Sequence, residues 1–196
     1  LGTAHMMRGQ VEDAIKAYER AVALAPNDAR ARGDLGTALL SANRPDHALP
    51  HLEAAVKLAP DRATFLSNLG YAQQQRGKLD QAIDTYKLAL KKDPKLGSAW
   101  INLGTALAQK GKLDEAEAAF KKAQALDASD PRVKANLGEL AELRKKTKPK
   151  PWARGRCLSC VVPKGAPEAW RGHPKSRAAA APGSRGAPTA ARAGLR

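Results

Sequence analysis

Two groups of residues have the types and spacing of metal ligands. Two residues separate Cys157 from Cys160, and twelve separate Cys160 from His173, which gives three of the four positions of a two-cysteine, two-histidine zinc site. No cysteine or histidine follows at the distance that the fourth ligand needs. Prolines also interrupt the hairpin and helix that such a site requires. We therefore expect no metal site here.

The second group is a histidine pair. His47 and His51 are four residues apart, which places them on one face of a helix, with Asp46 and Glu53 nearby. No third ligand is fixed by the pattern, and Pro50 lies between the histidines. We expect both to be surface residues without a metal. Since no Ser-His-Asp order, phosphate-binding loop or dinucleotide fingerprint appears either, we expect no catalytic residue and no cofactor.

The charge of the chain is unevenly distributed. The net charge is +15 over 196 residues. Residues 1–146 carry 23 Lys and Arg against 18 Asp and Glu, a net of +5, whereas 147–196 carry 11 against one, a net of +10. The latter segment is rich in Ala, Gly, Arg and Pro, and this composition predicts a basic disordered tail. Such a tail could bind nucleic acid without sequence preference. A frameshifted reading of GC-rich DNA gives the same composition, and that alternative stays open.

The strongest pattern is a repeat of 34 residues. Leu-Gly pairs begin at residues 1, 35, 69, 103 and 137. Other positions recur with the same period, namely small residues and one large apolar residue. The columns include the glycines Gly36, Gly70, Gly104 and Gly138, the alanines Ala48, Ala82 and Ala116, and the large residues Tyr18, Leu52, Tyr86 and Phe120. Several columns with one period indicate stacked copies of one supersecondary unit.

These columns resemble the tetratricopeptide repeat (TPR), whose pattern is Trp-x2-Leu-Gly-x2-Tyr, then Ala-x3-Phe, then Pro. Trp100, Leu103, Gly104, Ala116 and Phe120 match in one repeat. The tyrosine expected three residues after each glycine is replaced by His5, Leu39, Gln73 and Leu107. The resemblance covers about residues 1–146. It implies an all-α, right-handed solenoid of stacked helix hairpins, in which the first helix of each hairpin lines a concave groove.

Helical periodicity gives the expected boundaries. Val11, Ala14, Ile15, Tyr18 and Val22 share one helical face. The chain is expected to contain a truncated repeat at 1–28, full repeats at 29–62, 63–96 and 97–130, a capping helix at 131–146 and the tail at 147–196. Within the repeats, helices are expected at 1–8, 11–25, 29–42, 45–59, 63–76, 79–92, 97–110 and 113–127.

Small residues have two expected roles in these hairpins. Glycines or asparagine at 9, 43, 77 and 111 fit a left-handed backbone between paired helices. Mid-helix glycines such as Gly70 cost about 1 kcal/mol against alanine, so we expect them to permit close approach of the second helix. Tyr18, Tyr86 and Phe120 are then expected to fill the gap between neighbouring repeats.

The expected binding site lies around the Leu-Gly pairs. Asn68, Asn102 and Asn136 are 34 residues apart, and stacked repeats would align them as a ladder. A terminal amide both donates and accepts, so such a ladder can hold the backbone of an extended partner. The alternative is that these asparagines are solvated or bonded locally. Neighbouring candidate residues are Thr37, Tyr71, Gln74, Gln75, Ser98 and Thr105.

Chaperone-binding TPR proteins hold a carboxylate with several cationic side chains, and this sequence has only part of such a set. Arg30, Arg32 and Arg132 could take part. The other expected groove positions carry uncharged or acidic residues, namely Gly33, Asp34, Ser67 and Ile101. We therefore expect a largely neutral, polar groove.

The leading interpretation is a scaffold that binds a protein or an extended peptide. The alternatives are the substrate-recruiting part of a larger enzyme such as a glycosyltransferase, and nucleic-acid association through the tail. The start at Leu1 favours a truncated N-terminus. No stretch has the apolar length of a membrane span. The sequence does not identify the partner, and it gives only a weak preference for a cytoplasmic compartment.

Overall fold

The computed structural model describes residues 2–147, which contain nine helices and no strand. In chain order they are α1 (Gly2–Met7), α2 (Val11–Leu24), α3 (Ala29–Ser41), α4 (Pro45–Leu58), α5 (Ala63–Gln75), α6 (Leu79–Lys92), α7 (Gly97–Gln109), α8 (Leu113–Leu126) and α9 (Pro131–Thr147). Each boundary lies within one residue of the helix expected from the sequence. The hypotheses about Cys157, Cys160, His173 and the basic tail fall on residues 148–196, outside the described part.

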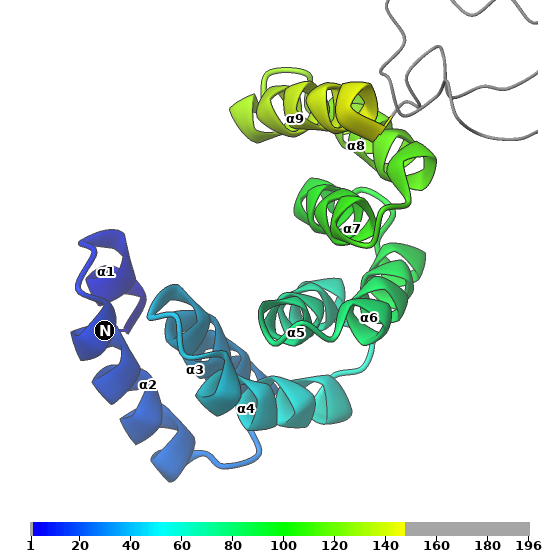
Figure 1. Cartoon of the computed structure of the whole chain (residues 1–196). Helices are drawn as coiled ribbons and strands as arrows, with labels where there is room; N and C mark the ends of the chain where they lie inside the picture. Colours follow the sequence, from blue (N-terminus) through cyan, green and yellow to red (C-terminus); the bar gives the residue numbers. More distant parts are fainter. Residues whose placement is uncertain (1, 148–196) are drawn as a thin grey trace, which may run out of the picture. The chain divides into compact units, whose positions relative to one another are not determined.

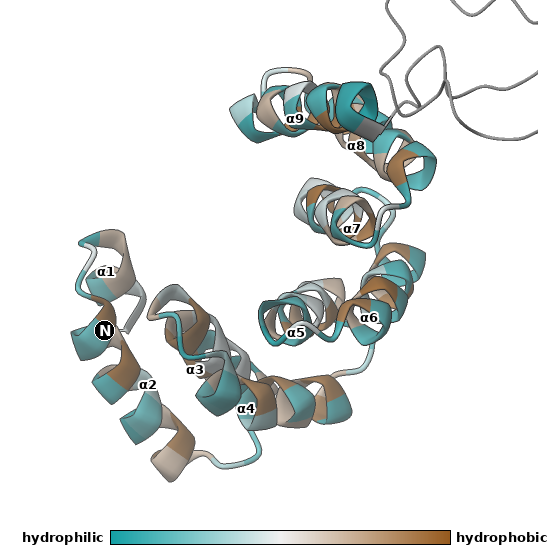
Figure 2. Cartoon of the chain, viewed as in Figure 1, coloured by the Kyte–Doolittle hydropathy of each residue, from teal (hydrophilic) through white to brown (hydrophobic). Residues whose placement is uncertain are grey.

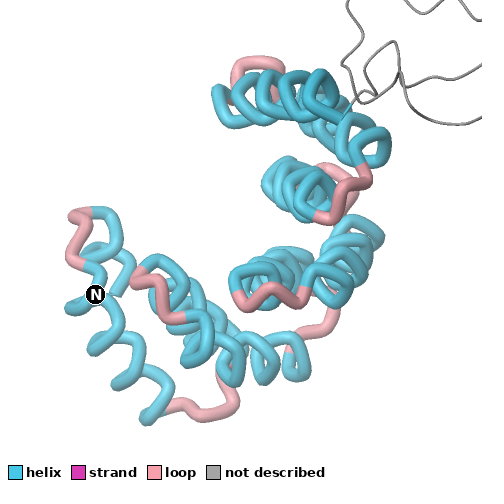
Figure 3. Tube along the Cα trace, viewed as in Figure 1, coloured by secondary structure: helices cyan, strands magenta, loops and turns pink. Residues whose placement is uncertain are grey.

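The helices form antiparallel pairs that stack in chain order. Each first helix packs against the second helix of its own pair, and each second helix packs against the next first helix. Figure 1 shows the first helices α1, α3, α5, α7 and α9 along the inner side of a curved row, with the second helices outside. Short loops join them at both ends (Figure 3). The all-α hairpin solenoid expected from the sequence is therefore confirmed for this part of the chain.

The turn inside each pair depends on a residue with positive φ. Gly9, Gly77 and Gly111 have φ of 73°, 72° and 79°, and Asn43 takes the same place with φ 56°. Glycine adopts this conformation without a steric penalty, and asparagine tolerates it better than most residues. The left-handed turns expected from the 34-residue spacing are therefore confirmed.

The mid-helix glycines bring paired helices into contact. A Cβ built on Gly104 would lie 2.5 Å from the ring of Phe120, and one on Gly70 would lie 2.8 Å from the ring of Tyr86. Real Cβ atoms do not approach this closely, so each ring lies directly over the glycine. The expected close approach is confirmed. Tyr86 and Phe120 were expected to fill the gap between neighbouring repeats. These contacts place both rings inside their own hairpin as well, and Phe120 also lines a pocket with residues of α9 in the next repeat.

Tyr18 and Leu52 make the same contact in the first two hairpins. A Cβ on Gly2 would lie 2.6 Å from the Tyr18 ring, and one on Gly36 would lie 2.6 Å from Leu52. Gly138 differs from the other glycines of its column, since a Cβ there would meet nothing within 4 Å. The described residues end with α9 and contain no partner helix of its own hairpin, so this glycine has the sequence position of the others without their packing role.

The apolar core lies between the two layers of helices. Figure 2 shows apolar residues concentrated where helices face one another and polar residues on the outer surfaces. Ala48, Ala82 and Ala116 lie on the second helices and are fully buried. Their small side chains let each second helix pack closely against its neighbours. The largest fully buried side chains include Tyr86, Phe120 and Leu35. Burial of these faces is the main source of stability for the stack.

A row of ion pairs joins consecutive repeats on the outside of this core. The acid lies in the first turn of a second helix, and in the first three pairs the base lies near the hairpin turn of the next repeat. Arg44 contacts Glu12 at 2.9 Å, and Arg76 contacts Asp46 at 2.7 Å. Two further pairs continue this ion-pair row, namely Lys110–Asp80 and Arg144–Asp114. The acids recur every 34 residues, so the row follows directly from the repeat.

We expect each pair in the row to contribute modestly to stability. The side chains are partly exposed, and exposed ion pairs typically contribute about 0.5 kcal/mol. A double-mutant cycle of Asp80→Asn and Lys110→Gln, followed by urea unfolding, should give a coupling free energy of that size. The coupling should shrink in high salt, because salt screens surface charges. A cycle of Asp84→Asn with Lys110→Gln is the control, since Asp84 has no ion pair within residues 2–147.

Candidate functional site

The candidate site is the inner face, by which we mean the side of α5, α7 and α9 that carries Asn68, Tyr71, Asn102, Thr105 and Asn136. Its two central helices, α5 and α7, contain no charged residue between their first and last positions. Their exposed groups are amides, hydroxyls and one aromatic ring. A surface of this kind offers hydrogen bonds without selecting a charge.

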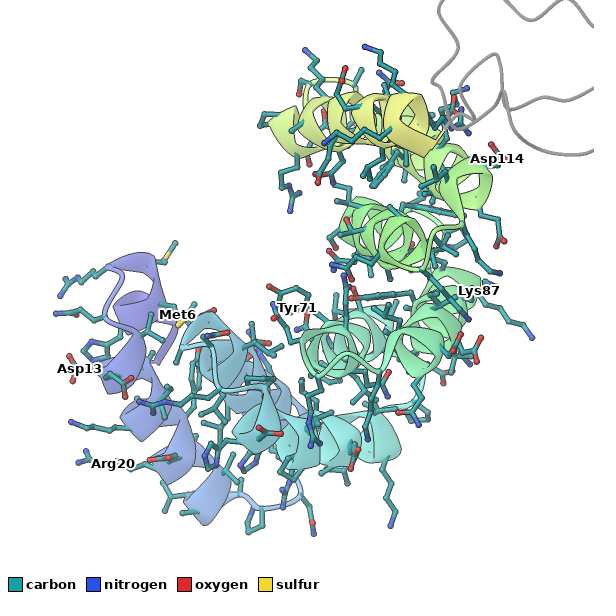
Figure 4. The ribbon with its side chains drawn as sticks, viewed as in Figure 1. Met6, Asp13, Arg20, Tyr71, Lys87 and Asp114 are labelled. Carbon is teal, nitrogen blue, oxygen red and sulfur yellow. The ribbon has the colours of Figure 1, made fainter. Side chains whose placement is uncertain are left out.

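Tyr71 is the large side chain at the centre of this face. It is 37% exposed and points from α5 toward the inner side (Figure 4). Gln75, one turn further along α5, donates from Nε2 to its phenolic oxygen at 2.7 Å. This hydrogen bond holds the ring in place while leaving it accessible. An exposed aromatic ring with a fixed orientation is suited to contact with a bound chain.

The structure places the three asparagines at the same position on successive first helices, but their bonding differs. Asn68 donates from Nδ2 to Thr37 Oγ1 at 2.8 Å, and Thr37 in turn donates to the Gly33 carbonyl. Asn102 and Asn136 make no side-chain hydrogen bond to another described residue, and both are half-buried. Local bonding therefore applies to Asn68, whereas the other two amides keep their full hydrogen-bonding capacity.

Gln74 lies deeper and connects two repeats. Its Oε1 accepts from the Tyr86 hydroxyl at 2.9 Å, and its Nε2 donates to Gln109 Oε1 at 3.0 Å. Burial raises the pKa of the Tyr86 phenol far above its usual range, so the hydroxyl stays a neutral donor. Gln74 thus acts mainly inside the stack. Ser98 and Thr105 remain partly exposed on α7, and the Thr105 hydroxyl donates to the Ile101 carbonyl.

A pocket of about 460 Å³ opens between α7, α8 and α9, and we call it the α7–α9 pocket. Its apolar side is formed by Ala108, Phe120, Leu140 and Leu143. Its polar side is formed by Thr105, Gln109, Asn136 and Glu139. Sequence reasoning missed Gln109, Glu139 and Leu143. The sequence did contain a signal for this pocket. Ala108 stands at the repeat position that Gln74 occupies one repeat earlier, and Phe120 stands at the position of Tyr86.

Three residues that the sequence placed in the groove are not exposed on the inner face. Ser67 and Ile101 are buried, and Gly33 lies under the ring of Phe65. The cations are also engaged. Arg132 pairs with Asp130 at 2.7 Å, and Arg30 lies 3.9 Å from Asp34. The residues considered for a carboxylate clamp are therefore not assembled on the inner face.

The histidine pair lies on α4, away from the inner face. His47 is exposed as expected, but His51 is half-buried, and its Nδ1 is buried with no hydrogen-bond partner among the described residues. Burial lowers the pKa of His51, and the positive charge of Arg32 lowers it further. Within residues 2–147 no three His, Cys, Asp or Glu side chains are grouped as metal ligands.

None of the described helices combines the length and the apolar character that are needed to cross a bilayer.

Comparison with solved structures identifies similar helical stacks. A thermophilic TPR protein from Thermus thermophilus is 26% identical with a TM-score of 0.66, covering 74% of this chain and 79% of its own. MamA is 23% identical with a TM-score of 0.65, covering 74% and 85%. YrrB, described as a TPR protein with an unusual peptide-binding site, is 24% identical with a TM-score of 0.60, covering 74% and 71%. A search of curated protein sequences gave no match.

The sequence itself carries the family assignment. The tetratricopeptide-repeat family model matches three overlapping windows, residues 1–63, 34–97 and 67–131. Successive windows begin 33 residues apart, close to the period of the Leu-Gly pairs. The paired helices, the glycine contacts and this match agree, and they support a protein-interaction scaffold. The chain belongs to the tetratricopeptide-repeat family.

Proposed function

We propose that the protein is a non-catalytic scaffold that binds an extended peptide segment of a partner along its inner face. The observation that carries this proposal is the combination of a charge-free α5 and α7 with the amides of Asn102 and Asn136, which have no partner in the described part of the chain. An extended peptide exposes backbone N–H and C=O groups at regular intervals. Amide side chains can satisfy both groups whatever the partner's sequence.

The inner face also supplies a contact for side chains. Tyr71 presents an accessible ring beside this row of amides, and Gln75 fixes its orientation. Backbone hydrogen bonds and aromatic contact together favour a polypeptide over a nucleic acid, since α5 and α7 carry no cation for phosphates. That YrrB is described as having a peptide-binding site agrees with this choice.

Replacement of Asn102 tests the proposal. Peptides would be selected for binding from a phage-displayed library of random linear peptides, with the full chain as bait. Their affinity for Asn102→Ala should fall about fivefold, as expected for loss of one hydrogen bond of about 1 kcal/mol. The melting temperature should not change, because the Asn102 side chain has no described partner.

Two further variants separate binding from folding. Asn68→Ala should lower both affinity and melting temperature, because it also removes the hydrogen bond to Thr37. Asn27→Ala, in the exposed loop between α2 and α3, should change neither. Unchanged affinity of Asn102→Ala and Asn68→Ala with an intact fold would rule out the asparagine row as the peptide contact.

A further inference from the structure

The α7–α9 pocket exists because one repeat differs from the repeat before it. At the corresponding place between α5 and α7, Gln74 reaches both Tyr86 and Gln109 through hydrogen bonds of 2.9 and 3.0 Å. One period later, Ala108 stands in place of Gln74, and Phe120 stands in place of Tyr86. Both the long amide and its hydroxyl partner are therefore missing together. The space that Gln74 fills in one repeat is open in the next.

The chemistry of this open space is mixed. Phe120, Leu140 and Leu143 provide an apolar wall, while Asn136 and Glu139 line the pocket with side-chain oxygen atoms. Glu139 is exposed and makes no ion pair or hydrogen bond with another described residue. By contrast, Glu142 on the same helix pairs with Lys145 at 2.6 Å. Glu139 is therefore a free negative charge next to a charge-free stretch of the inner face.

A long cationic side chain matches both halves of the pocket. Lysine and arginine combine an apolar stem with a charged head, and they bury the stem while the head stays at a polar surface. A neutral apolar side chain would leave Glu139 without a partner, and an acidic one would be repelled by it. We propose that the α7–α9 pocket takes a lysine or arginine side chain of the bound peptide, with its stem against Phe120 and Leu143 and its cation at Glu139.

This inference rests on the proposed function, and it adds a rule of specificity to it. The row of asparagines holds the backbone of a peptide of any sequence. The α7–α9 pocket then selects peptides that carry a basic residue where they pass over α9. Charge-assisted hydrogen bonds are stronger than neutral ones, so this contact should dominate the choice among peptides.

Selection from the same peptide library tests the rule. Against the wild-type chain, the enriched peptides should share a lysine or arginine at one position. Against Glu139→Gln, that enrichment should disappear, and peptides selected on the wild type should bind about tenfold more weakly. Glu142→Gln is the matched control, and it should leave both enrichment and affinity unchanged, because Glu142 pairs with Lys145.

A second variant closes the pocket without touching Glu139. Ala108→Gln combined with Phe120→Tyr recreates the Gln74–Tyr86 pair one repeat later, so it should fold and should lose the preference for a basic residue. Enriched peptides without a shared basic residue, or with one that survives Glu139→Gln, would overturn the pocket while leaving the scaffold function intact. If no peptide is enriched with any variant, both the pocket and the peptide-binding proposal are wrong.

Discussion

Gly104→Val should lower the free energy of unfolding by about 3 kcal/mol, near the upper end of the usual cost of overpacking. A Cβ at this position would lie 2.5, 2.7 and 2.9 Å from three atoms of the Phe120 ring, and valine adds two further carbons. Phe120 is only 2% exposed, so its ring can yield only toward the α7–α9 pocket that it lines. Either that displacement or a separation of the two helices of the fourth hairpin disrupts the packing. Urea unfolding followed by circular dichroism measures the change.

The matched control is Gly138→Val. Gly138 has the same place in the 34-residue repeat, but a Cβ there meets nothing within 4 Å. Valine forms helix slightly better than glycine, so this change should leave stability unaltered or raise it by a few tenths of a kcal/mol, ~0.3. Equal losses at the two positions would show that the glycine column is not required for the approach of paired helices.

Tyr86→Ala should be the most damaging single truncation, with a loss of about 4 kcal/mol. The ring is fully buried over Gly70, and the hydroxyl is the donor to Gln74 Oε1. Removal leaves a cavity between α5 and α6 and deprives the half-buried Gln74 amide of one of its two hydrogen bonds. Because Gln74 also bonds to Gln109, the damage should extend to α7. Amide hydrogen exchange should show lost protection in α5, α6 and α7 together.

Tyr71→Ala is the comparison for this change. Tyr71 is the same residue type on α5, but it is exposed on the inner face, so its removal should cost less than about 1 kcal/mol. It should instead weaken peptide binding. If Tyr71→Ala destabilised the fold as much as Tyr86→Ala, the inner face could not be treated as a surface separate from the core.

The fold was predictable from the sequence because one period fixes most of it. The spacing of the Leu-Gly pairs placed every described helix to within one residue, and the positions of Gly9, Asn43, Gly77 and Gly111 placed the turns. The seating of Phe120 on Gly104 inside one hairpin was not predicted, because periodicity aligns repeats without saying which neighbouring surfaces a side chain meets.

The site was less predictable, since it depends on where repeats differ. Asn102 and Asn136 could be named as candidates because they obey the period, whereas Glu139 stands where the preceding repeat has Thr105 and breaks the period. Ser67 and Ile101 were counted as groove residues, although each directly precedes an inner-face asparagine, lies about 100° away from it around the helix, and is buried. The sequence shows the acids of the ion-pair row, because they recur every 34 residues. It does not show the whole row, because Arg44, the base of the first pair, is out of phase with Arg76 and Lys110.

The pairing of each helix with its sequence neighbours has a mechanical consequence. Among the described helices, the extensive contacts lie within a hairpin or join adjacent hairpins, and none of these joins α1 or α2 to α7, α8 or α9. Within this part of the chain, a change in end-to-end distance is therefore resisted mainly by the sum of small rotations at the joints. The array should behave as a soft spring, whose extension adjusts to the length of whatever lies along it.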